Sequence, residues 1–285
     1  MANEALAPTG LARRGRRLSD TETERRMLQA AVAMVNRTGL TVSLDHISFE
    51  DVIRDADVSR SAVYRRWPYK DLFFSDLVKE LASADAVPAI VDAETELIRR
   101  IVAERLEWLA TPGLRHRLVI ELFRQLPLLD FQVLYQSVGW RTYLALHATF
   151  MSLASGALRD QVQAALARSE HERITSVAGA WQRLTALFGY RLRPEAGVTF
   201  EALATILSAM SRGLVVMAPS TPEIATNRFD ASPFGTDFAA EWSLPSIGIA
   251  SIASSLLEPD PAVEWDDERI ASIRRALLIS EAPVA

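Results

Sequence analysis

The sequence predicts an all-α protein in which a small N-terminal helical unit precedes a larger C-terminal helical domain. Apolar residues recur at the three- and four-residue spacing of amphipathic helices along nearly the whole chain. Strand and helix patterns do not alternate as in parallel α/β proteins, and turn residues are too sparse for a β-sandwich. Apolar residues make up 49% of the sequence, which allows a large core and excludes a disordered chain.

Three helices are expected near the N-terminus, of which the first two are as follows. The first runs over about residues 20–38 with its apolar residues on one face, and Gly39 is placed to end it. Ser48, with Asp51 three positions on, resembles a capping box that opens a second helix of about residues 48–56.

The segment 58–70 is the most informative part of the chain. After a serine cap it predicts a helix in which Val63 and Trp67 lie four positions apart and face inward. Pro68 ends this helix, and a lysine opens the next one. Polar and basic side chains are left on the outer face, as in a helix that enters the major groove of DNA. We therefore predict a helix-turn-helix unit that binds DNA sequence-specifically.

The rest of the chain is nearly all helical in pattern. Helices are expected at about 69–83, 92–110, 114–126, 128–137, 140–155, 158–169, 171–190, 199–217, 243–257 and 266–279. Residues 218–242 contain three prolines and a glycine and are expected to form a surface loop. The predicted organisation is a disordered basic arm (1–18), a helix-turn-helix DNA-binding domain (19–84) and a helical ligand-binding and dimerisation domain (85–285).

Composition limits the classes of protein to which the chain can belong. Its 285 residues suffice for about two domains. The absence of cysteine excludes disulfides and thiolate metal sites and fits a reducing compartment. The four histidines lack metal-ligand spacing, and no glycine-rich phosphate loop or nucleophile elbow occurs. We expect no metal, no cofactor and no enzymatic activity, with an enzyme as the remote alternative.

No signal peptide and no membrane span are expected. The arginines of residues 13–17 lead into a polar run rather than an apolar one. The longest uncharged run, 142–158, contains a histidine and several hydroxyl residues and is shorter than the about 20 apolar residues of a transmembrane helix. The expected location is the cytoplasm.

Basic charge is concentrated at one end of the chain. The formal net charge is −5, yet residues 13–70 contain twelve Lys and Arg against eight Asp and Glu. The rest of the chain contains nineteen against twenty-eight. A DNA-binding module on an acidic body fits this division, because attraction of phosphate acts within about 10 Å at 0.1 M salt. A chance fluctuation of surface charge is the alternative.

These positions together resemble the tetracycline-repressor (TetR) family. The resemblance is carried by the order Met27-Leu28-Gln29-Ala30-Ala31, Gly39, Val52-Ile53, Ala56-Asp57-Val58-Ser59, Val63-Tyr64, Trp67-Pro68 and Lys70-Asp71-Leu72. It implies an all-α homodimer whose N-terminal domains bind a palindromic double-stranded DNA operator. It also implies that larger C-terminal domains bind a small-molecule effector, which releases the DNA, so that the protein is a transcriptional repressor.

The chain departs from the family pattern at three places. Asp57 stands where the family usually has a turn glycine, and aspartate tolerates the left-handed backbone that this turn needs. Extra residues within 41–47 separate Gly39 from the second helix. The chain is also longer than usual for the family, with the 218–242 segment and a tail past Glu258.

The predicted DNA contacts fall into three groups. For base edges we expect Arg60, Ser61, Ala62 and Tyr64, with Tyr64 also resembling a family tyrosine that meets the DNA backbone. Arg60 either forks onto a guanine or contacts only phosphate, and Ala62 touches a thymine methyl or is a spacer. The expected phosphate contacts are Ser48 and Lys70, with Arg65 as an additional candidate, and Ser59 is expected to contact the DNA as well. Arg13, Arg14, Arg16 and Arg17 form an arm for the adjacent minor groove, or a solubilising tail.

The effector pocket and the dimer surface are placed in the C-terminal domain. Candidate pocket residues are aromatic or polar and lie on the middle helices: Phe123, Arg124, Trp140, Tyr143, His147 and Trp181. Ordinary core packing is the alternative for each of them. Small residues at 246–255 favour helices 199–217 and 243–257 as the dimer surface, although a buried intramolecular helix looks similar.

The alternative function is a DNA-binding architectural or activating factor without an effector. The identity of the effector, the operator sequence and the controlled genes do not follow from these residues. Neither does the choice between repression and activation, nor the role of the 218–242 segment.

Overall fold

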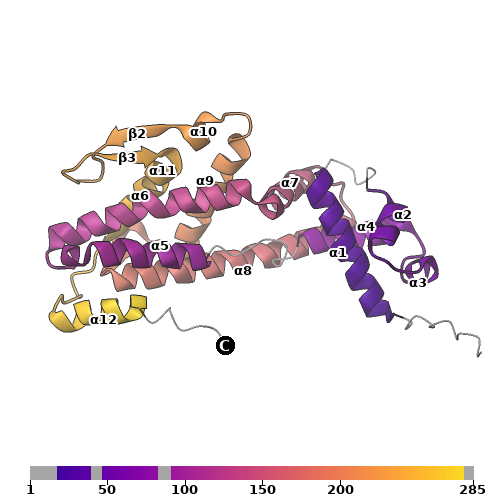
Figure 1. The fold of residues 1–285 in the computed structure, drawn as a ribbon, viewed down its shortest axis with the longest axis horizontal. Coiled ribbons are helices and arrows are strands. Elements are labelled where there is room, and N and C mark those ends of the chain that lie inside the picture. The colour runs from indigo at the N-terminus through magenta and orange to yellow at the C-terminus, as the bar shows by residue number, and fades with distance from the viewer. Residues whose placement is uncertain (1–17, 40–46, 83–90, 279–285) are drawn as a thin grey trace, which may run out of the picture.

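The computed structural model describes residues 18–39, 47–82 and 91–278. The molecule is elongated, with a small head at one end and a larger helical body at the other (Figure 1). The head consists of α1 (Asp20–Thr38), α2 (Phe49–Asp55), α3 (Arg60–Arg66) and α4 (Lys70–Leu81). Two long helices, α6 (Pro112–Gln136) and α8 (Ala157–Leu187), run along the body toward the head (Figure 1).

The remaining elements complete the body. Its other helices are α5 (Val91–Glu104), α7 (Val138–Ser152), α9 (Phe200–Met217), α10 (Glu223–Thr226), α11 (Leu244–Leu256) and α12 (Asp267–Leu278). Short 3₁₀ turns form at Leu106–Leu109 and Pro194–Ala196. The prediction of an all-α fold is confirmed, with short strands added at a few places.

The strands correct two expectations. Strands β2 (Arg228–Ala231) and β3 (Ala240–Ser243) pair antiparallel, so residues 218–242 hold a short helix and a hairpin rather than an irregular loop. In the hairpin turn Gly235 has φ 74°, and the carbonyl of Phe234 accepts a 2.7 Å hydrogen bond from His116 on α6. Strands β1 (Tyr190–Leu192) and β4 (Leu257–Pro259) pair where helix ends were expected.

Two predicted helix breaks are wrong. Pro127 lies inside the continuous helix α6, where it is buried. Packing of α6 in the body therefore outweighs the hydrogen bond that proline removes. Helix α8 also continues through residue 170, where a break was expected. The apolar face of α8 changes there, because Leu166 joins one core and Leu184 packs against another.

Two apolar cores hold the molecule together. The first contains the buried face of the head and extends into the body through Phe131, Trp140 and Leu166. The second lies wholly in the body, between α5, α6, α9 and α11. The head therefore shares one continuous core with α6, α7 and α8, and this core connects the head mechanically to those helices.

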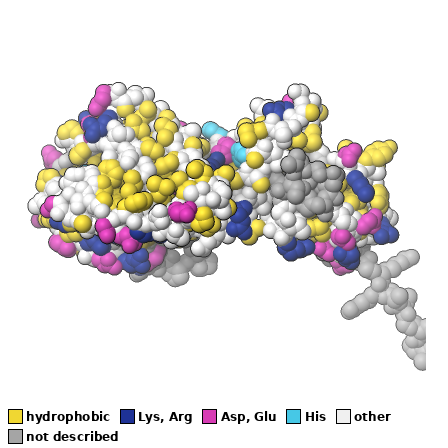
Figure 2. Space-filling model, turned by 90° about the horizontal axis from the view of Figure 1, so that it is seen from above, with side chains coloured by type: hydrophobic (Ala, Val, Ile, Leu, Met, Phe, Trp, Pro, Cys, Tyr) yellow, Lys and Arg dark blue, Asp and Glu magenta, His cyan; other side chains and the backbone are white. Residues whose placement is uncertain are grey.

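Helix α9 is long and apolar enough to cross a membrane by length and composition alone, although 28% of its residues are buried in the fold. It packs against α6, α8 and α11. The outward side of α9 exposes apolar residues, among them Ile206 at 44% and Val216 at 60%. Figure 2 shows a broad hydrophobic area on the upper face of the body.

Candidate functional site

Local sequence signals place α3 as predicted. The side chains of Ser48 and Ser59 each accept a 3.3 Å hydrogen bond from a backbone N–H of the helix that they cap. Asp57 has φ 51°, which confirms that aspartate makes the left-handed turn between α2 and α3. Val63 and Trp67 are fully buried, so the opposite side of α3 faces outward.

Contacts with two other helices fix the end of α3. The guanidinium of Arg66 donates to both carboxylate oxygens of Glu24 on α1, each at 3.0 Å. The indole Nε1 of Trp67 donates to Asp76 on α4 at 2.8 Å. Helix α3 is therefore anchored on two sides, which gives its outward side chains a defined orientation.

The outward face of α3 contains the predicted base-contact residues. Arg60, Ser61 and Tyr64 are exposed, and Ala62 is half-buried. Tyr64 lies four positions after Arg60 and three after Ser61, so it neighbours both on the surface of the helix. The ring of Tyr64 packs edge-on against Phe49 at a centroid distance of 5.8 Å, so the ring is supported by the head as expected.

The other predicted DNA contacts of the head lie at helix starts or on α3. Ser59 and Arg65 are exposed, Ser48 is half-buried at the start of α2, and Lys70 is the exposed first residue of α4. The predicted arm residues Arg13, Arg14, Arg16 and Arg17 lie outside the described residues.

Both exposed arginines Arg60 and Arg65 of α3 form ion pairs with carboxylates of other helices. Arg60 pairs with Glu50 through Nη2 and Oε2 at 2.7 Å, and Tyr64 donates a 3.1 Å hydrogen bond to Oε1 of Glu50. Arg65 forms an ion pair with Asp20 at the start of α1. None of these acidic partners was predicted. Their sequence distances of 10 to 45 residues mean that only the packing of three helices brings them together.

The folded head carries no excess of positive charge. Within residues 18–39 and 47–82 there are nine Lys and Arg against ten Asp and Glu. The basic excess that the sequence places at residues 13–70 therefore comes from the four arginines of the predicted arm. Phosphate attraction by the head alone is correspondingly weak.

The six predicted effector residues divide into three places. Trp140, Tyr143 and His147 lie together on α7, next to the head. With three residues that the sequence did not single out they form the junction cluster, which we define as Trp140, Tyr143, His147, Glu170, Arg173 and Arg212. One signal for the missed residues exists: Arg212 is the single charged residue between Glu201 and Glu223.

Glu170 is the centre of the junction cluster. Its carboxylate accepts hydrogen bonds from the hydroxyl of Tyr143 and, at 2.7 Å, from Nη1 of Arg212. Burial acts to raise the pKa of Glu170, but His147, Tyr143 and Arg212 outweigh it and lower the pKa to about 2. Glu170 is therefore ionised at neutral pH and links α7, α8 and α9.

Three buried nitrogen atoms of the cluster have no hydrogen-bond partner in the part of the chain that the structure describes. They are Nε1 of Trp140, Nε2 of His147 and Nε of Arg173. Nε2 of His147 lies 3.4 Å from Oε1 of Glu170 without the alignment of a hydrogen bond. Buried polar groups are normally paired. A region with unpaired polar nitrogen atoms is a candidate place for a ligand or water that supplies hydrogen-bond partners.

A hollow of about 390 Å³ lies beside the cluster, between α8 and α9. Glu170 and Arg212 line it together with Ile174, Thr205 and Ala209, among others. Figure 2 shows histidine side chains beside acidic and basic ones at the waist between head and body. The volume falls within the usual range of small-molecule sites, about 300–1,000 Å³.

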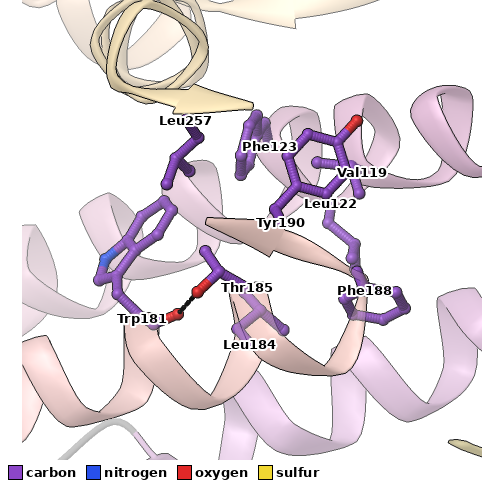
Figure 3. A pocket seen from close by; sticks show the side chains of 9 residues that line it. All are labelled: Val119, Leu122, Phe123, Trp181, Leu184, Thr185, Phe188, Tyr190 and Leu257. Atoms are coloured by element: carbon purple, nitrogen blue, oxygen red, sulfur yellow. Dashed lines mark hydrogen bonds between the residues drawn. The ribbon is translucent and has the colours of Figure 1, made fainter. Parts of the chain in front are cut away.

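The other predicted effector residues are structural in this conformation. Phe123 and Trp181 line an apolar space of only about 10 Å³ (Figure 3), which is filled core rather than a pocket. Arg124 donates to the buried carboxylate of Glu121 at 2.7 and 2.8 Å and to the carbonyl of Glu241 at 3.1 Å. Arg124 thus joins α6 to β3.

Among known proteins, no family model and no curated sequence matches the chain. The fold is similar to a crystal structure described as a transcriptional regulator of the TetR family from Agrobacterium tumefaciens. The two share 16% sequence identity over 71% of this chain and 90% of the other, with a TM-score of 0.40. That likeness is too distant to assign a family or a function to this chain.

Proposed function

We propose that the protein is a sequence-specific DNA-binding transcriptional regulator. The observation that carries the proposal is the exposed face of α3, where Arg60, Ser61 and Tyr64 project from a helix that is anchored on both sides. A helix of this kind following a tight turn is the reading element of helix-turn-helix proteins. The neighbouring helix starts at Ser48 and Lys70 supply free backbone N–H groups for phosphate.

Useful specificity requires two heads, because one reads only a few base pairs. We propose a homodimer that places two α3 helices about 34–36 Å apart, one turn of DNA. We propose that the protomers meet through α9 and the outward side of α11. The exposed apolar side chains of α9, Ile206 and Val216 among them, support this dimer surface.

The junction cluster is proposed as the effector region, in which a small molecule weakens DNA binding. Two observations support this proposal: the three buried nitrogen atoms without a hydrogen-bond partner among the described residues, and the neighbouring hollow. It also lies close to the head: Thr142 on α7 donates a 2.7 Å hydrogen bond to Asn36 on α1, and α4 packs against α7 and α8. A ligand that moves these helices would change the spacing of the two α3 helices in the dimer.

The test is selection of a random duplex library by the purified protein, repeated with Arg60→Ala. Arg100→Ala, which removes an exposed arginine from the body, is the matched control. We expect an inverted repeat with half-sites about one helical turn apart, relaxed at one base position by Arg60→Ala alone. If no sequence is enriched, the proposal of a sequence-specific regulator is wrong, and an architectural protein that binds only the DNA backbone becomes the better interpretation.

Control by a small-molecule effector is tested separately, by melting temperature and operator affinity. A compound that raises the melting temperature and also weakens operator binding supports ligand control, because binding at two sites is then coupled. Compounds that stabilise the protein without changing operator affinity would instead favour a DNA-binding factor without an effector. The nearly filled core around Phe123 and Trp181 is the observation that keeps this second candidate open.

A further inference from the structure

Glu50 contacts two residues of the reading helix at once. It lies in the first turn of α2 and is exposed. One carboxylate oxygen pairs with Arg60 at 2.7 Å, and the other accepts the hydroxyl proton of Tyr64 at 3.1 Å. An acidic residue at this position is unexpected, because a surface that meets DNA gains affinity from cations.

The contact restricts what Arg60 can do. The ion pair between Glu50 and Arg60 runs through Nη2 of the guanidinium, and arginine has five N–H donors. A guanidinium held on one side by a carboxylate keeps its remaining donors in a fixed orientation and loses less side-chain freedom when it forks onto a guanine. Arg60 can therefore contact a matching base while it remains paired with Glu50.

Contact with phosphate is different. A phosphate competes with Glu50 for the guanidinium of Arg60, because both are anions. A carboxylate that loses this partner lies close to a chain of negative phosphates. Since the folded head holds as many acidic as basic groups, little other attraction offsets this repulsion. Glu50 thus disfavours binding in which Arg60 serves only as a backbone contact.

We propose that Glu50 is a specificity-determining residue that positions Arg60 and Tyr64 for base contacts and weakens binding to DNA that lacks the matching bases. The proposal rests on the proposed DNA-binding function. It assigns a role to an acidic side chain of α2, outside the reading helix itself. Affinity without sequence preference is left to other cations.

The test compares Glu50→Gln with Glu80→Gln. Glutamine keeps the length of the side chain and an oxygen that accepts from Tyr64, but it loses the charge that holds Arg60. Glu80 is an exposed residue near the end of α4, so its substitution removes the same charge away from α3. Dissociation constants are measured for the duplex recovered by selection and for a random-sequence duplex of equal length, at the same salt concentration.

We expect Glu50→Gln to tighten binding of the random duplex and to lower the ratio of specific to non-specific affinity by about tenfold, the low end of the effect of one mismatched base pair. Glu80→Gln should leave the ratio unchanged. In an Arg60→Ala background, Glu50→Gln should change the ratio much less, because Glu50 is proposed to act through Arg60. A purely structural role of Glu50 would not produce this dependence on Arg60.

The outcomes separate the two proposals. If the natural protein selects no sequence, the DNA-binding regulator itself fails. If it selects a sequence but Glu50→Gln and Glu80→Gln give the same ratio, the role of Glu50 is overturned and the regulator stands. An equal effect of Glu50→Gln with and without Arg60 also overturns it.

Discussion

The indole Nε1 of Trp67 donates a 2.8 Å hydrogen bond to Oδ2 of Asp76 and so joins the end of α3 to the middle of α4. The carboxylate of Asp76 also pairs with Lys79 at 2.5 Å and lies 3.4 Å from Nη2 of Arg66. Because Trp67 is fully buried, its N–H depends on this acceptor. Asp76 thereby connects the reading helix to the helix that contacts the body.

Two substitutions of Asp76 are expected to destabilise the protein to different extents. Asp76→Asn keeps an oxygen for Trp67 but loses the ion pairs, and it should lower the free energy of unfolding by about 1 kcal/mol. Asp76→Ala also leaves a buried N–H unpaired and should cost about 1–3 kcal/mol more. Urea unfolding at pH 7 measures both. Equal losses for the two variants would contradict a role for the Trp67 hydrogen bond.

A change in pH should change the protonation of the carboxyl group of Asp130, a half-buried residue of α6. Burial, and then repulsion from Glu94 on α5, raise the pKa of Asp130 to about 7, although Ser211 and Arg212 act in the opposite direction. The folded state therefore holds a proton that the unfolded state releases near its ordinary value of 3.8. Stability should fall as pH rises from about 4 to 7 and level off above that range.

The variant Asp130→Asn removes this dependence. It should stabilise the protein by about 1–2 kcal/mol at pH 8 and by much less at pH 5. Asp230→Asn, at an exposed position of β2, is the control. The measurement is the free energy of unfolding across this pH range. If Asp130→Asn has the same effect at both pH values, Asp130 is not protonated in the folded protein.

For Glu170 we expect the opposite dependence of stability on pH. Its pKa is lowered from 4.5 to about 2, so its contribution is complete above the unfolded value and is lost as pH falls through the folded one. Glu170→Gln should therefore lower the free energy of unfolding by about 2 kcal/mol at pH 7, and the difference from the natural protein should shrink between pH 4.5 and 2. Glu172→Gln, an exposed neighbour on α8, should have little effect. A loss that does not change with pH would mean that Glu170 acts through packing rather than charge.

Local signals explain which parts of the fold the sequence predicts. The caps at Ser48 and Ser59 and the turn at Asp57 depend on neighbouring residues alone, and each forms as expected. The breaks expected near Pro127 and Glu170 do not form, because packing of long helices in two cores overrides local patterns. Strands β1 and β4 are far apart in the chain and carry no strand signal of their own.

The candidate sites follow the same rule. The outward face of α3 could be read from the spacing of Val63 and Trp67, since one buried face defines the other. The partner of Arg60 could not, because Glu50 lies on a different helix and its position depends on the angle between α2 and α3. For the same reason the sequence indicated Trp140, Tyr143 and His147 of the junction cluster but not the residues on α8 and α9.

The exposed apolar side of α9 gives a prediction for assembly. Ile206 is 44% exposed and Gly213 has open space around its Cα, so a second helix can approach closely there. Ile206→Glu should leave the folded protomer intact, because the side chain already faces outward, and should convert a dimer into a monomer. Binding to an inverted repeat should then fall by at least about 100-fold, because the two heads no longer bind as one unit. Light scattering measures the mass, and titration with the selected duplex measures the affinity. Met151→Glu, at a 78% exposed position of α7, is the matched control and should change neither. If Ile206→Glu stays dimeric, the protomers meet elsewhere, and α9 must be covered by something other than a second copy of this chain.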